Sequence, residues 1–176
     1  MAPARPAGRR LTRVDDLFSP PGDTWRPVSP ALAGMRHLEA LLATVVVLVA
    51  LVVLTLVLSL PAGAWIPLTL VVVGLGALAW LLGGRNARRW GYAERDEDLY
   101  IRHGVMFRTL VVVPYGRMQY VDVHAGPLEQ LFRIASVHLH TASPGTSARI
   151  PGLPAIEAAR LRDRLTSLGE AQAAGL

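Results

Sequence analysis

The stretch Leu41–Leu60, LLATVVVLVALVVLTLVLSL, decides the fold of this chain because its twenty residues include no ionisable side chain. A helix of that length rises about 30 Å, which matches the hydrocarbon thickness of a bilayer. A second uncharged stretch, Ala64–Leu82 (AWIPLTLVVVGLGALAWLL), follows after the short loop Pro61–Gly63. Helices that are apolar on every side are typical of membrane spans. The sequence therefore predicts a transmembrane hairpin.

The hairpin is expected over residues 37–84, with helices at about 38–60 and 64–83. A three-residue loop cannot cross a bilayer, so both termini should lie on the same side. The loop is uncharged, whereas arginines flank the hairpin outside it, which predicts a multi-pass protein of the cell membrane with both termini in the cytoplasm. The alternative, signal-peptidase cleavage near the small residues Ala62–Ala64, is disfavoured because some forty residues precede the first apolar stretch.

Neither span contains Asp, Glu, Arg, Lys or His, and transport pathways usually need such groups at membrane depth. We therefore interpret the hairpin as an anchor, in which Gly74 and Gly76 are expected to let the helices approach closely. The formal charge of +5 comes from arginine alone, and the chain has no cysteine. Disulfides, thiol catalysis and cysteine-based zinc sites are thereby excluded. Nothing in the composition favours a nucleic-acid partner.

The regions on either side of the hairpin differ in character. Residues 1–36 contain six prolines and scattered arginines, which predicts a disordered cytoplasmic tail. Residues 90–169 alternate apolar and polar side chains between turn signals and predict a small domain, with a disordered C-terminus at 170–176. Its expected elements are strands at Asp98–Arg102, Val105–Val113, Met118–His124, Ala135–Thr141 and Arg149–Ile150, a helical turn at Leu128–Arg133, and an amphipathic helix at Ala155–Leu168 between Pro154 and Gly169. This pattern indicates an α+β fold.

The run Tyr100–Ala142, YIRHGVMFRTLVVVPYGRMQYVDVHAGPLEQLFRIASVHLHTA, is followed by IPGL and a helix containing LRDRL. With the hairpin before it, this order resembles the bacterial pleckstrin-homology-like (PH-like) domain of membrane-flanked proteins, the YdbS-like family. The resemblance covers roughly residues 40–168. It implies a PH-like barrel of two bent antiparallel sheets with a C-terminal α-helix, and a binding module rather than a defined reaction. Arg133 stands where the pattern R-x-x-G-L has glycine, so that turn is expected to be altered.

No motif in the chain supports catalysis or a cofactor. The domain's histidines lack a third and fourth ligand in an evident register, so we predict no metal site; they are His103, His124, His138 and His140. An acidic run at Glu94–Asp98 is interpreted as a solvated turn. No nucleophile elbow, triad spacing or glycine-rich phosphate loop is present. The sequence therefore predicts no enzyme, no cofactor and no small-molecule substrate.

Two surfaces remain as candidates for binding. Three arginines leave the second apolar stretch and are expected to contact lipid headgroups: Arg85, Arg88 and Arg89. A candidate interaction surface on the domain comprises Arg108, Tyr115, Arg117 and Gln119. The leading hypothesis is a membrane-anchored scaffold that binds a protein partner or forms homo-oligomers. The alternatives are recognition of anionic lipid in envelope maintenance, and an accessory subunit of a transporter or membrane enzyme. An open sheet edge would favour the first, and an arginine-lined pocket the second.

Overall fold

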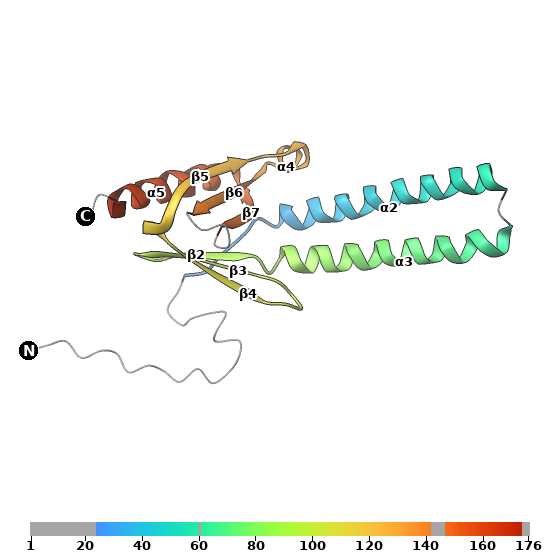
Figure 1. The fold of residues 1–176 in the computed structure, drawn as a ribbon, viewed down its shortest axis with the longest axis horizontal. Helices are drawn as coiled ribbons and strands as arrows, with labels where there is room; N and C mark the ends of the chain where they lie inside the picture. The colour runs from blue at the N-terminus through green and yellow to red at the C-terminus, as the bar shows by residue number, and fades with distance from the viewer. Residues whose placement is uncertain (1–23, 60, 142–146, 174–176) are drawn as a thin grey trace, which may run out of the picture.

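The computed structural model describes residues 24–59, 61–141 and 147–173. Two long antiparallel helices extend together from one end of a small α+β domain (Figure 1). The domain contains two antiparallel sheets and a C-terminal helix, as the resemblance to PH-like domains implies. The prediction of an α+β fold with an N-terminal helical hairpin is confirmed.

The hairpin consists of α2 (Ala31–Leu58) and α3 (Ala62–Ala87). Both are long and apolar enough to cross a membrane, and in the most apolar 18-residue segment of each span at most 6% of the residues are buried. A water-soluble protein could not leave so much apolar surface uncovered. Gly76 lets the helices approach closely, because a Cβ atom there would overlap Thr44 of α2. Gly74 has no neighbour within 4 Å, so its predicted role in helix packing is wrong.

Helix α2 begins seven residues earlier than predicted and lies partly inside the domain. Its 28 residues span about 42 Å, which exceeds the thickness of the hydrocarbon layer. The excess of about 12 Å corresponds to the first two turns, within which Leu32, Ala33 and Met35 are buried in the domain core. Leu32 lies very close to Gly152 of the second sheet: a Cβ atom added to Gly152 would be 2.7 Å from the Cβ atom of Leu32.

The prediction of a disordered tail over residues 1–36 is therefore wrong for its last part. Strand β1 (Arg26–Pro27) adds to the edge of the first sheet, and Val28 joins the core. Within regular structure, proline is tolerated mainly in edge strands and at the start of helices. Pro27 lies in the edge strand β1, and Pro30 lies at the start of α2. The prediction for residues 1–23 lies outside the described residues.

The first sheet has the order β1-β2-β3-β4 and the second the order β5-β6-β7. Neighbouring strands in both sheets are antiparallel. The connection between the sheets is the short 3-10 helix η1, and helix α4 links β5 to β6. The bounds are β2 (Gly91–Glu94), β3 (Asp98–His103), β4 (Thr109–Pro114), η1 (Tyr115–Arg117), β5 (Met118–His124), α4 (Pro127–Leu131), β6 (Ile134–Thr141) and β7 (Ala148–Pro154).

Strand β5 matches its predicted bounds, and β3 and β6 match within one residue. Strand β4 is shorter than predicted, because residues 105–108 form the turn between β3 and β4 rather than extended chain. Strand β2 was not predicted, and Glu94 at its end is not part of a solvated turn. Residues 95–97, which include the acidic Asp96 and Glu97, do connect β2 to β3.

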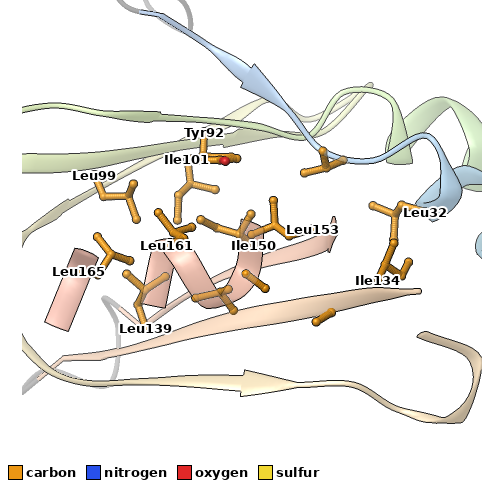
Figure 2. Packing of buried hydrophobic residues seen from close by; sticks show 14 of the residues in the cluster. Leu32, Tyr92, Leu99, Ile101, Ile134, Leu139, Ile150, Leu153, Leu161 and Leu165 are labelled. Atoms are coloured by element: carbon orange, nitrogen blue, oxygen red, sulfur yellow. The ribbon is translucent and has the colours of Figure 1, made fainter. Parts of the chain in front are cut away.

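The core lies between the two sheets and helix α5 (Ala155–Ala173) (Figure 2). Tyr92, Leu99 and Ile101 enter it from the first sheet, opposite Leu139 and Ile150 of the second. Helix α5 contributes a stripe at helical spacing: Ala158, Leu161 and Leu165, all fully buried.

Helix α5 corrects two predictions. Ile156 belongs to the apolar pattern that predicts the buried face of this amphipathic helix, but it is 86% exposed because it lies on the side of the helix away from Leu161. Gly169 was expected to end the helix, and residues 170–176 were expected to be disordered. Helix α5 continues through Gly169 to Ala173, and residues 174–176 lie outside the described part of the chain.

Candidate interaction surfaces

The exposed edge of the first sheet is strand β4. Among the described residues β4 pairs with β3 alone, so its other side presents unpaired backbone groups. Its sequence, TLVVVP, carries no charged side chain. Val113 is buried and Val111 packs against the core, whereas Val112 on the opposite face is 40% exposed. Natural sheets usually protect such edges with charges, bulges or a covering element.

The predicted interaction surface lies around the two ends of β4. Arg108 immediately precedes the strand, Arg117 follows it in η1, and Gln119 lies in β5; all three are exposed. Tyr115 is not part of this surface. It is fully buried, and its hydroxyl donates a hydrogen bond to the carbonyl of Arg95 over 2.9 Å. Burial raises the pKa of the Tyr115 hydroxyl to about 12, so the residue has a structural role.

The three arginines predicted to contact lipid lie at the end of α3 that adjoins the domain. Arg85 is in the last turn of the helix and Arg88 caps it, while Arg89 follows, and all three are exposed. Cations at this position also interact favourably with the helix dipole. Their contact with headgroups stays a prediction.

A cluster of charged residues joins β1, β2 and the start of α5. Glu157 accepts hydrogen bonds from Tyr92 (2.6 Å), Arg26 (3.1 Å) and Arg160 (2.9 Å). Glu94 forms ion pairs with Arg26 (3.7 Å), with Arg160 and with Arg164 (3.0 Å). The hydrogen bond from Arg160, followed by that from Tyr92, lowers the pKa of Glu157 to about 2. Each of these arginines is paired with a carboxylate, so the cluster stabilises the packing of β1 and β2 against α5.

Two grooves formed by described residues of the domain lack a continuous arginine lining. The groove between β1 and the start of α5 contains one arginine, Arg26, which is paired with Glu157 and Glu94. The groove between β5 and the C-terminal half of α5 is lined by Met118, Tyr120 and other residues without an arginine. The feature that would favour lipid recognition is therefore not found in these grooves, whereas an open sheet edge is present.

The histidines of the domain lie in separate ring contacts. In the part of the chain that the structure describes, no three His, Asp or Glu side chains are grouped so that they could hold a metal ion. Burial lowers the pKa of both His103 and His138. The ring contacts are His103 on Trp90 (4.4 Å), His140 on Tyr120 (4.2 Å) and His124 against His138 (5.0 Å).

Helix α4 is held against the second sheet by Glu129, which is largely buried. Glu129 accepts hydrogen bonds from the Ser136 hydroxyl (2.6 Å) and the Gly126 N–H (2.9 Å), and Arg149 lies 3.4 Å away. Burial acts to raise the pKa of Glu129, but these hydrogen bonds and the charge of Arg149 together lower it. The carboxylate therefore fixes the position of this short helix.

Arg133 follows α4 with a φ of 55°, in the left-handed region where glycine is the usual residue. A residue with a side chain is strained in this conformation. The expectation that Arg133 alters the turn relative to its family stays a prediction.

A comparison of sequences shows the family of this chain. The profile of the bacterial PH domain family matches residues 33–168. The chain belongs to this family. Over 103 residues it is 36% identical to the UPF0699 transmembrane protein YdbS of Bacillus subtilis (strain 168), an alignment that covers 53% of this chain and 63% of that protein. The chain thus aligns with less than two thirds of this relative. No solved structure matches it at a significant level.

This bacterial PH domain protein is therefore a YdbS-like membrane protein, and its family is not a known enzyme family. Sequence reasoning missed the contribution of residues 24–35 to the domain. The signal was weak: Leu32 and Met35 are three residues apart and flank Ala33, which is a helical apolar pattern. It was obscured by the neighbouring prolines and by the much stronger apolar stretch that follows.

Proposed function

We propose that this protein is a membrane-anchored binding module that does not catalyse a reaction, and that its PH domain recruits a partner protein by strand addition at β4. In this proposal α2 and α3 both cross the bilayer, and the domain lies on the cytoplasmic side with both termini. The observation that carries the proposal is the open, uncharged edge of β4. Strand addition uses backbone hydrogen bonds for affinity and neighbouring side chains for specificity.

The direction of β4 bears on the identity of the partner. The strand starts beside the end of α3 and runs away from the helix pair (Figure 1). In two copies anchored side by side in one bilayer, both β4 strands would run away from the membrane and could only pair in parallel. Parallel pairing is the less stable arrangement per residue. An extended segment of a different protein, running towards the membrane, can pair in the antiparallel sense, and this is the partner we propose.

Crosslinking of the full-length protein in its membrane tests this proposal. A photoreactive amino acid is placed at Val112, and crosslinked proteins are identified by mass spectrometry. We expect a protein crosslink that disappears when Leu110→Lys introduces a charge beside the edge. It should persist with Ile156→Lys, a matched change at an exposed apolar residue of α5.

Three results would refute the proposal. One is the absence of any protein crosslink from position 112, and another is a crosslink that Leu110→Lys leaves unchanged. The third is a crosslink to a second copy of this chain alone, which would indicate a homo-oligomer in place of the partner proposed here.

A further inference from the structure

Two exposed apolar tips lie at the end of the domain from which the membrane helices extend. The first is the turn between β3 and β4, where Met106 is 78% and Phe107 is 82% exposed. The second is α4, where Leu131 is 68% exposed. Both elements lie at the end of the domain nearest to α2 and α3 (Figure 1).

The β3–β4 turn is tied to the end of α3. His103, the last residue of β3, stacks on Trp90 with ring centroids 4.4 Å apart, and Trp90 follows α3 within three residues. Gly104, with a φ of 100°, makes the sharp bend that a residue with a side chain would strain. The tip carrying Phe107 therefore has a defined position beside α3.

The α4 tip is tied to the beginning of α2. Glu129 holds α4 against β6 through its bond to Ser136. Phe132, directly after α4, lies against α2, where a Cβ atom on Gly34 would be 3.1 Å from its ring. Leu131 is thus presented beside α2, as Phe107 is beside α3, and the two tips flank the helix pair.

Each tip combines an apolar side chain with a neighbouring arginine. Arg108 follows Phe107 and Arg133 lies two residues after Leu131, and both arginines are exposed. Apolar side chains next to arginines suit the membrane interface, where the apolar group enters the acyl region and the guanidinium meets phosphate. Two helices long and apolar enough to cross a membrane leave the domain at this end, so a bilayer that they span would face these tips.

We propose that the domain inserts Met106 and Phe107 on one side, and Leu131 on the other, into the interface of the bilayer that its own helices span. With the helix pair, these tips make three points of contact that fix the tilt of the domain on the membrane. This contact goes beyond the proposed recruitment at β4 and does not depend on it.

Single-cysteine variants of the full-length protein test the proposal, since the chain has no native cysteine. A spin label is attached to Phe107→Cys, Met106→Cys or Leu131→Cys, and the protein is reconstituted into vesicles of phosphatidylcholine and phosphatidylglycerol. The controls are Thr166→Cys and Gln172→Cys, both exposed on α5, whose C-terminal end points away from the helix pair (Figure 1). Collision rates with oxygen, which concentrates in lipid, are compared with those of a water-soluble nickel chelate.

We expect the ratio of oxygen to chelate collisions to be several-fold higher at positions 106, 107 and 131 than at positions 166 and 172. The difference should persist in high salt, because apolar insertion is not screened. Equal ratios at the tips and on α5 would overturn the proposal. So would a difference that high salt abolishes, since the arginines alone would then hold the domain at the surface.

Discussion

Removing residues 24–36 from the domain should strongly destabilise it, although they precede the membrane hairpin and the rest of the domain follows it. The comparison is between a water-soluble fragment, residues 85–173, and the same fragment joined to residues 24–36 by a short glycine-serine linker in place of the membrane hairpin. The linker is feasible because Arg36 and Gly83 are neighbours: a Cβ atom on Gly83 would lie 3.5 Å from the Arg36 Cβ.

The expected loss can be worked out from burial. Val28, Leu32 and Met35 are at most 7% exposed. Burying an aliphatic side chain of this size contributes about 1.5–3 kcal/mol, so the three together contribute about 6 kcal/mol. The Ser29 N–H also donates a 2.8 Å hydrogen bond to the Gly152 carbonyl. Domains of this kind have a total stability of about 5–15 kcal/mol, so a loss of about 6 kcal/mol removes all of the stability of a domain near the lower limit and a large part of it otherwise.

Urea unfolding followed by circular dichroism and tryptophan fluorescence measures the effect. The linked domain should unfold cooperatively, and Leu32→Ala within it should lower the free energy of unfolding by about 2–5 kcal/mol. Val112→Ala, at an exposed position of β4, serves as the control and should have little effect. If fragment 85–173 alone unfolds cooperatively at the same urea concentration as the linked domain, the start of α2 is not part of the core and the reasoning is wrong.

Three further predictions concern the linked domain. Arg133→Gly should raise the free energy of unfolding by about 0.5–1 kcal/mol, because glycine removes the strain of the left-handed conformation at some cost in the entropy of the unfolded chain. An unchanged urea midpoint would contradict this. Gly152→Ala should lower the free energy of unfolding by about 2 kcal/mol or more, because φ is 72° and the new methyl group would meet Leu32. Gly126→Ala is the control and should be tolerated, because φ is −69° and a Cβ atom there would make only an ordinary 3.8 Å contact with a Glu129 carboxylate oxygen. Glu157→Gln should lower stability at neutral pH by about 2 kcal/mol, less than the full pKa difference implies because part of the carboxylate is exposed. Folding lowers the pKa of Glu157 from 4.5 to about 2, so the stabilisation by its carboxylate is complete above pH 4.5 and is lost as the pH falls towards 2. The difference in unfolding free energy between wild type and variant should therefore disappear over that range in urea titrations at successive pH values. A difference independent of pH would contradict the assignment.

Part of the candidate site followed from sequence and part did not. Arg108, Arg117 and Gln119 are exposed near the ends of β4, and their role in binding stays a prediction. Tyr115 was misplaced because Pro114-Tyr115-Gly116 has the composition of an exposed turn, and only the packing of α5 over η1 buries the ring. The open edge of β4 could not be predicted, since an uncharged strand can equally lie inside a sheet.

The sequence by itself determined the helix pair, because length and the absence of charge are local properties that no tertiary contact can alter. It also determined most strands, since alternation of apolar and polar residues records which face is buried. Only the tertiary structure decided that residues 24–35, among prolines and before the membrane spans, complete the domain. Their burial depends on Gly152 and the second sheet, more than a hundred residues away, and no local pattern reports a contact at that distance.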